Sequence, residues 1–141
     1  MSRPPAVRIE ERQIFAMGGG GFTMEPNNPL LDDYVLSLTR RTEPRILFLP
    51  TASGDTTAQI NAFKARFAHR TCVAEHVSLF RMRETARSLE ETVFAQDIVY
   101  VGGGSMRNLL AIWRAHGVDT LLLDAWKSGI ELAGLSAGAM C

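Results

Sequence analysis

Short runs of large apolar residues alternate along this chain with longer stretches in which apolar residues recur every three or four positions. The short runs predict strands, and the longer stretches predict helices with one apolar face. Strands are predicted near residues 13–17, 45–50, 72–79, 98–101 and 129–135, and helices near residues 29–41, 55–68, 84–94, 105–117 and 119–127. Most of these strands are apolar throughout, which is typical of strands buried on both faces. The pattern therefore predicts an α/β fold with a mostly parallel sheet between two layers of helices.

The strand and helix units follow one another without a linker or a low-complexity segment. The chain has 141 residues, of which 46% are hydrophobic and 21% charged, and this composition is that of a globular protein. A chain of this length buries about 70% of its unfolded surface. We therefore expect a single α/β domain over residues 1–141.

The charge balance argues against two classes of partner. Fifteen Lys and Arg residues match fifteen Asp and Glu residues, which removes the positive charge that grips phosphate backbones or anionic lipid. No apolar run approaches a membrane span, and the first residues, "MSRPPAVRIEERQ", lack the apolar segment of a signal peptide. We expect no nucleic-acid partner, no membrane partner and a cytoplasmic location.

Neither a metal nor a nucleotide cofactor is indicated by the motifs. The two cysteines, Cys72 and Cys141, lack the paired spacing of zinc ligands. The glycine-rich segments at residues 18–21 and 102–104 fit neither the P-loop, which needs G-K-[ST], nor the G-x-G-x-x-G spacing of a dinucleotide site. We expect chemistry that uses no cofactor and no metal.

Four glycine-rich or polar segments follow predicted strands directly. They are "GGGGF" after the first strand, "PTASGD" after the second, "VGGGS" after the fourth and "GLSAGA" after the fifth. In a parallel sheet the ligand crevice lies outside the carboxyl ends of the strands. The four loops are therefore predicted to converge on one rim.

Residues 134–138, "GLSAG", fit the G-x-S-x-G pattern of a nucleophile elbow. The serine of such an elbow sits on a strained turn between strand and helix, and the flanking glycines let neighbouring backbone pass without a clash. The pattern predicts Ser136 as a nucleophile and the Ala137 amide as a donor to the oxyanion. A structural turn of small residues is the simpler alternative.

A second candidate group lies in "VGGGS", where three glycines follow a buried strand and precede a capped helix. Such a loop can turn the amides of Gly103 and Gly104 toward a bound oxyanion. A tight turn alone would explain one glycine but not three. Thr51, Ser53 and Asp55 lie on the same predicted rim, where Asp55 is equally expected to act as a helix N-cap.

A serine hydroxyl is a weak nucleophile unless a base within hydrogen-bond reach takes its proton. The chain contains only three histidines. His69 and His116 are predicted near helix ends, at the opposite edge of the sheet from Ser136, and His76 is predicted inside a strand. No convincing base is found within this chain.

Taken together and in order, "GGGGF", "LFLPTASGD", "IVYVGGGSMRNLLAIW" and "LAGLSAGAMC" resemble the peptidase E branch of serine peptidase family S51, with its dipeptidase E and cyanophycinase relatives. The resemblance implies a three-layer sandwich of the class I glutamine-amidotransferase type, with serine in place of the cysteine nucleophile. It assigns the nucleophile to Ser136 and the oxyanion region to Gly103, Gly104 and Ala137.

In that family the histidine and the acid of the triad follow the elbow in the chain. The resemblance therefore implies the N-terminal portion of a longer serine peptidase, truncated just inside the helix after the elbow and inactive by itself. It also implies small peptides as substrates, with dipeptides bearing an N-terminal aspartate foremost. Two alternatives remain: an α/β-hydrolase esterase, which shares the elbow pattern, and a non-catalytic binding module that covers an exposed face as a homo-oligomer.

Overall fold

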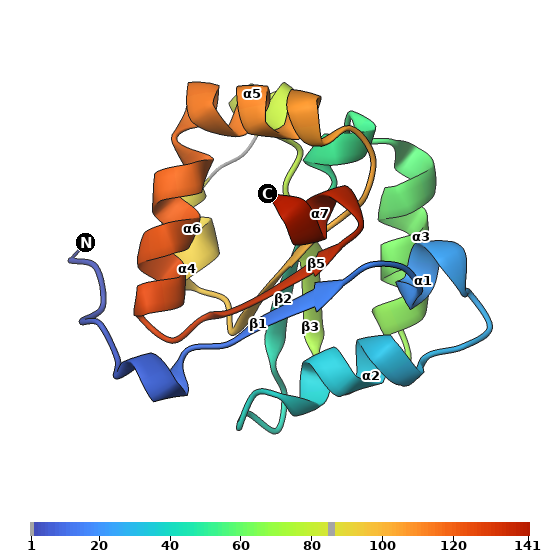
Figure 1. The fold of residues 1–141 in the computed structure, drawn as a ribbon, viewed down its shortest axis with the longest axis horizontal. Helices are drawn as coiled ribbons and strands as arrows, with labels where there is room; N and C mark the ends of the chain where they lie inside the picture. Colours follow the sequence, from blue (N-terminus) through green and yellow to red (C-terminus); the bar gives the residue numbers. More distant parts are fainter. Residues whose placement is uncertain (1, 85–86) are drawn as a thin grey trace.

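A computed structural model describes residues 2–84 and 87–141 of the chain. Its sheet has five strands, β1 (Ile14–Met17), β2 (Arg45–Leu49), β3 (Val73–His76), β4 (Ile98–Val101) and β5 (Glu131–Leu135). They are ordered β1-β5-β4-β2-β3, and every pairing is parallel. The predicted parallel sheet is confirmed (Figure 1).

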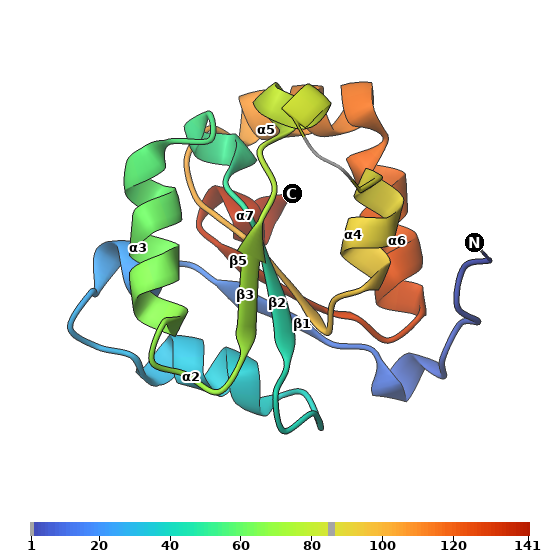
Figure 2. The ribbon, with the colours of Figure 1, turned by 180° about the vertical axis from the view of Figure 1, so that it is seen from behind.

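Two layers of helices cover the sheet, as Figures 1 and 2 show from opposite sides. The helices are α1 (Gly21–Met24), α2 (Leu30–Ser37), α3 (Thr57–Phe67), α4 (Leu89–Phe94), α5 (Met106–His116), α6 (Val118–Lys127) and α7 (Ala137–Met140), with 3-10 turns η1 (Ile9–Glu11), η2 (Thr51–Ser53) and η3 (Leu79–Glu84). Helices α1 to α3 pack on one face of the sheet, and α4 to α6 pack on the other. The predicted three-layer α/β sandwich is therefore confirmed.

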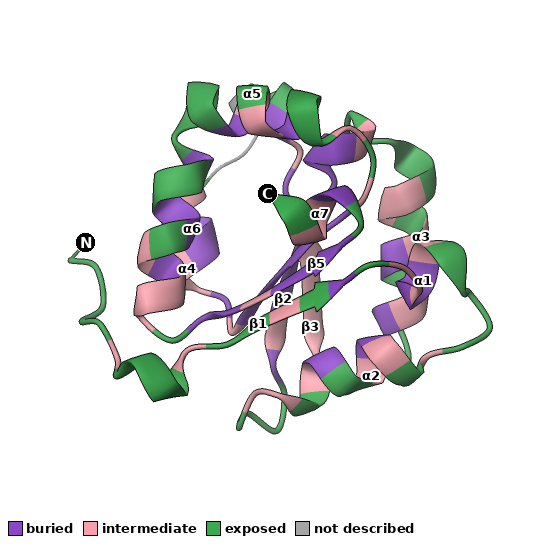
Figure 3. Ribbon diagram, viewed as in Figure 1, coloured by how far each residue is buried: buried purple, intermediate pink, exposed green. Residues whose placement is uncertain are grey.

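Side chains of the central strands fill both cores alternately. Leu47, Leu49, Val99 and Val101 point into the core under α4 to α6, whereas their neighbours in β2 and β4 point toward α1 to α3. All four residues of β4 are buried, while β1 at the edge of the sheet has exposed positions (Figure 3). This explains why β4 reads as a continuous apolar run.

The segment at residues 18–21 leads into α1, a short helix that the sequence pattern did not predict. Its Phe22 packs against three aromatic rings, those of Phe48, Phe63 and Tyr100, at centroid distances of 5.3, 5.7 and 5.3 Å. The contacts with Phe48 and Phe63 are edge-to-face, and contacts of this kind add to the burial of apolar area. The glycine-rich segment is thus anchored by a buried aromatic cluster.

A buried ion pair lies beneath the same segment. The Tyr100 hydroxyl donates to Asp32 Oδ1 at 3.0 Å, and Arg66 Nε lies 2.9 Å from Asp32 Oδ2. Burial raises the pKa of Asp32, an effect that the hydrogen bond from Tyr100 and the charge of Arg66 oppose. Since removal of one partner would leave an unpaired buried charge, these three side chains fix α2 against α3.

Several element boundaries differ from those predicted. Helix α2 ends at Ser37, short of the predicted residue 41, and β3 covers only part of the predicted 72–79. Ser88 caps α4 through a capping box with Glu91, and residues 85–86 of the predicted helix lie outside the described residues. Ser105 caps α5 as predicted, accepting a hydrogen bond from the Asn108 amide.

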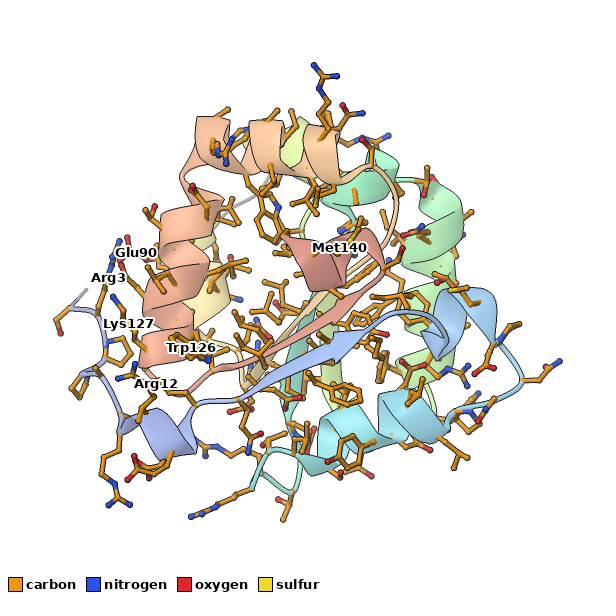
Figure 4. All side chains as sticks on the ribbon, viewed as in Figure 1. Arg3, Arg12, Glu90, Trp126, Lys127 and Met140 are labelled. Carbon is orange, nitrogen blue, oxygen red and sulfur yellow. The ribbon has the colours of Figure 1, made fainter. Side chains whose placement is uncertain are left out.

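The N-terminal segment is fastened to α6 and α4. The Val7 amide donates to the Lys127 carbonyl at 2.8 Å, and the Arg12 guanidinium lies 5.2 Å from the ring centroid of Trp126. Arg3 forms ion pairs with Glu90 and Asp124. Figure 4 labels most of these side chains, which gather along α6, well apart from Met140 on α7.

Among the described helices, none is both long enough and apolar enough to cross a bilayer.

Candidate active site

Ser136 occupies a strained turn between β5 and α7. Its backbone has φ 55° and ψ −113°, a conformation that residues other than glycine rarely adopt. The Ser136 amide donates to the Met17 carbonyl at 2.8 Å, and the side chain is exposed. The strain and the exposure are those of a nucleophile elbow.

The two glycines of the motif are required by close backbone approaches. A Cβ at Gly134 would overlap the carbonyl of Gly138, and a Cβ at Gly138 would overlap the carbonyl of Val101. Neither glycine has a positive φ, so the requirement is space rather than conformation. The spacing on either side of Ser136 thus follows from how tightly α7 folds back over β4 and β5.

The glycine loop at residues 102–104 lies directly beside the elbow, because β4 and β5 are neighbours in the sheet. A Cβ built on Gly103 would lie 3.3 Å from the Ser136 Cβ and 3.9 Å from its Oγ. Gly104 has φ 144° and packs against the Ala52 carbonyl, where any side chain would overlap backbone. A glycine is therefore required at position 104, both by the backbone conformation and by the lack of space for a side chain.

The amides that the sequence assigned to an oxyanion site have no hydrogen-bond partner among the described residues. Within residues 2–84 and 87–141, the N–H groups of Gly103, Gly104 and Ala137 donate no hydrogen bond. An unpaired amide must be satisfied by water or by a ligand. Backbone amides without a partner are the type of donor from which oxyanion holes are built.

The polar residues of the 50–55 loop serve the fold instead. Thr51 Oγ1 accepts a buried hydrogen bond from Trp113 Nε1 at 3.2 Å, and Ser53 Oγ donates to the Pro50 carbonyl at 2.9 Å. Asp55 Oδ2 accepts from Ser78 Oγ at 2.6 Å and from the Phe80 amide at 3.1 Å.

The expectation that Asp55 caps a helix is wrong. Helix α3 begins at Thr57 after Thr56, and neither residue donates a hydrogen bond to Asp55. Asp55 instead has φ 57°, which turns its carboxylate toward the segment after β3. The gain of two hydrogen bonds to an ionised carboxylate accounts for this conformation.

No histidine bonds to Ser136. In the part of the chain that the structure describes, which includes all three histidines, Ser136 Oγ takes part in no hydrogen bond. His69 follows α3, and His116 is the last residue of α5. His76 lies in β3 opposite Phe48, and burial lowers its pKa. The candidate nucleophile therefore lacks a base among the described residues.

Sequence reasoning missed one residue beside the candidate site. Gln59, the third residue of α3, donates from Nε2 to the Gly103 carbonyl at 3.3 Å. One glutamine within a helix gives no sequence signal, because the contact depends on how α3 packs on the sheet. No group of three or more potential metal ligands is found in residues 2–84 and 87–141.

An apolar hollow of about 190 Å³ lies between the β1–β5 edge of the sheet, α5, α6 and α7. Its wall includes Trp113, Leu122, Leu132 and the backbone of Gly138. Two large apolar side chains on this side of the molecule are exposed, Ile14 by 64% and Leu123 by 46%. Apolar side chains thus remain uncovered next to the elbow helix.

A family model described as peptidase family S51 matches residues 14–141. The uncharacterized peptidase YgaJ of Bacillus subtilis (strain 168) is 50% identical over 130 residues, which are 92% of this chain and 56% of YgaJ. The chain therefore spans about half the length of that curated relative.

Two crystal structures are similar in fold. One, a peptidase from an acI-B1 actinobacterium, has a TM-score of 0.72 at 20% identity, and the match covers 90% of this chain and 55% of that one. The other, described as a peptidase E protein of Listeria monocytogenes EGD-e, has a TM-score of 0.66 at 21% identity, with 90% of this chain and 59% of that one covered. At these levels of sequence identity, the two matches show similarity of fold alone.

Proposed function

Because the chain belongs to peptidase family S51, we propose that it carries the nucleophile and the oxyanion site of a serine peptidase. One observation carries the proposal: Ser136 is exposed on strained backbone, and it lies beside amides that donate no hydrogen bond to a described residue. Ser136 attacks the carbonyl carbon of a peptide, and the leaving amine departs from the tetrahedral intermediate to give an acyl-enzyme. Water then releases the acyl group.

The role of the free amides follows from where charge develops. As the hydroxyl oxygen attacks, the carbonyl oxygen becomes an oxyanion, which the N–H groups of Gly103, Gly104 and Ala137 would stabilise. Donors of this kind are each worth about 10² to 10³ in kcat. The scheme uses neither a cofactor nor a metal.

A base must come from outside the described residues. Because Ser136 Oγ has no hydrogen-bond partner there, we infer that the 141 residues alone have no triad-dependent peptidase activity. In the family pattern the histidine and the acid lie in the part of the chain after the elbow, and this chain covers 56% of the length of YgaJ. A histidine supplied by that part would act as the base and then as the acid.

Small peptides are the proposed substrates, with dipeptides bearing an N-terminal aspartate as the first class to test. This preference rests on the resemblance to dipeptidase E. The esterase alternative predicts activity on p-nitrophenyl esters instead.

The test is a hydrolysis screen with the protein produced from its own gene. Asp-X dipeptides, other dipeptides and p-nitrophenyl esters are compared for the wild type and for Ser136→Ala. The proposal expects dipeptide hydrolysis that falls at least about 10³-fold in the variant. Hydrolysis that survives Ser136→Ala, or a preference for esters by orders of magnitude, would reject it.

A second candidate role is self-association, which the uncovered apolar side chains around the hollow favour. Ile14, Leu123 and the exposed Met140 would then lie between two copies. Light scattering of the 141-residue protein tests this role: a dimer supports it, whereas a monodisperse monomer at high concentration argues against it.

A further inference from the structure

The glycine loop beside Ser136 is held at its two ends by backbone. The Gly102 amide donates to the Leu49 carbonyl at 3.1 Å, and the Ser105 amide donates to the Ala52 carbonyl at 2.8 Å. Between these ties lies the peptide that joins Gly103 to Gly104. Within the described residues, the hydrogen bond from Gln59 is the one that reaches this peptide.

The direction of that hydrogen bond is set by chemistry. Gln59 Nε2 faces the Gly103 carbonyl at 3.3 Å. If the amide were turned over, Oε1 would face the same carbonyl, and two acceptors would oppose each other. Oε1 instead lies on the side of Gly102, where a Cβ on that residue would come within 3.1 Å of it.

A trans peptide is planar, so its C=O and N–H groups point in opposite directions. By holding the Gly103 carbonyl toward α3, Gln59 points the Gly104 N–H away from α3. Nothing in the glycines themselves selects this orientation, because neither carries a side chain and glycine populates positive and negative φ about equally. Reversal of the peptide would exchange the N–H for a C=O, which repels an oxyanion.

We propose that Gln59 is a positioning residue that selects the orientation of the Gly103–Gly104 peptide and so presents the Gly104 amide to the oxyanion. The inference rests on the proposed function, since it assigns a task at the same site. Gln59 touches no reacting atom. It acts through a loop that lies against Ser136, with Gly103 in close contact with the elbow.

The first test compares Gln59→Leu with a matched control on the same helix, Asn61→Leu. Asn61 is exposed and two residues further along α3. With the protein produced from its own gene, Gln59→Leu is expected to lower kcat about tenfold and leave KM within about twofold, because a transition-state interaction is lost. The control should leave both constants within about twofold. A Gln59→Leu enzyme with unchanged kcat would overturn the proposal.

The second test uses Gln59→Glu, which introduces a side chain whose ability to donate depends on pH. When ionised, the introduced carboxylate has no proton to donate and repels the Gly103 carbonyl, whereas the protonated acid can donate as the amide does. The ratio of variant to wild-type kcat should therefore rise as the pH falls toward about 4.3, the ordinary pKa of a glutamate side chain. The ratio for Gln59→Leu should stay flat. Parallel profiles for the two variants would contradict a hydrogen-bonding role.

A third readout does not depend on catalysis. In the isotopically labelled 141-residue protein, NMR reports the carbonyl carbon of Gly103 and the amide nitrogen of Gly104. Gln59→Leu should shift or broaden both signals, and Asn61→Leu should leave them in place. Unchanged signals would overturn the proposal even if activity fell, and a collapsed spectrum would assign Gln59 to folding instead.

These readouts separate two kinds of failure. If Ser136→Ala retains hydrolysis, the proposed function is wrong, whereas the NMR signals still decide whether Gln59 orients the peptide. If Ser136→Ala is inactive and Gln59→Leu is fully active with unmoved signals, the proposed function stands and the positioning role fails.

Discussion

Two loops leave the carboxyl edge of the sheet from neighbouring strands, β2 and β4, and they use their polar groups in opposite ways. The 50–55 loop has polar side chains that bond to the protein: Thr51 to Trp113, Ser53 to Pro50 and Asp55 to Ser78. The 102–104 loop has no side chains at all, yet two of its amides have no described partner.

The difference shows that polar sequence on a rim is a poor guide to the site. A polar side chain is long enough to find a partner within the fold, and burial makes that partner necessary. The amides of a glycine loop have no neighbouring side chain of their own loop to bond them, so they remain available to a ligand. The open backbone amides at the rim therefore mark the candidate site.

The largest expected effect concerns the glycine side. Gly138→Ala brings a methyl group into overlap with the Val101 carbonyl, and because the clash is with backbone, relieving it must shift the main chain. We expect a loss of about 4 kcal/mol or more in the free energy of unfolding, measured by urea denaturation. Gly18→Ala is the control, because a Cβ there meets nothing within 4 Å. Equal stability of the two variants would show that the elbow is looser than described.

A buried group without a described hydrogen-bond partner also lies far from the rim loops. Glu131, at the start of β5, is 3% exposed, and neither carboxylate oxygen has a partner among the described residues. Burial raises its pKa from 4.5 to about 8. Because a buried carboxyl group without a hydrogen-bond partner is costly to ionise, Glu131 is expected to lower stability once it loses its proton.

The sign of the resulting pH dependence follows from proton binding. Between pH 4.5 and 8 the unfolded chain has lost the Glu131 proton while the folded chain keeps it, so stability falls as the pH rises. The loss is about 1.4 kcal/mol per pH unit and sums to a few kcal/mol. Glu131→Gln should remove this pH dependence of the free energy of unfolding, which urea denaturation at about pH 5, 7 and 9 would measure. Identical pH profiles for variant and wild type would show that Glu131 is solvated.

A smaller effect on stability is expected for the polar side chains of the 50–55 loop. Asp55→Ala removes the acceptor for Ser78 Oγ and for the Phe80 amide. We expect a loss of about 2 kcal/mol in stability, because two hydrogen bonds are lost. Glu43→Gln, at a position with no hydrogen bond among the described residues, should be neutral. Both variants should keep the hydrolytic activity of the wild type. If activity fell only in Asp55→Ala while its stability was unchanged, the 50–55 loop would have to be part of the site.

The smallest effect is expected at Thr51. Thr51→Val keeps the shape of the side chain but leaves the buried Trp113 Nε1 without its acceptor. We expect the free energy of unfolding, measured by thermal unfolding, to fall by about 1 to 2 kcal/mol. The tryptophan fluorescence emission should shift as well. An unchanged emission maximum would mean that water replaces the threonine.

Much of the fold could be predicted because its signals are local. The apolar run of β4 and the Ser105 cap of α5 each depend on adjacent residues, and the structure confirms both. The elbow was readable because its G-x-S-x-G spacing is local, although the crowding at Gly138 comes from Val101 in the neighbouring strand. The assignment of Ser136, Gly103, Gly104 and Ala137 to catalysis stays a prediction.

What could not be predicted depends on packing between distant segments. Asp55 offered a good cap by its position, but two donors after β3 compete for its carboxylate and bind it instead. The contact of Gln59 with Gly103 joins residues 44 positions apart. The strand order that makes β4 and β5 neighbours likewise leaves no local mark in the chain.

The most direct test compares two serines of the rim, Ser136 and Ser53. Ser136 is open and Ser53 is bonded to Pro50 and Thr56, so Ser136→Ala and Ser53→Ala are made in the protein produced from its own gene. Hydrolysis of an Asp-X dipeptide should fall at least about 10³-fold in Ser136→Ala and stay within about twofold in Ser53→Ala. Retained hydrolysis in Ser136→Ala, or its loss in a folded Ser53→Ala, would contradict the assignment of the site to the open loops.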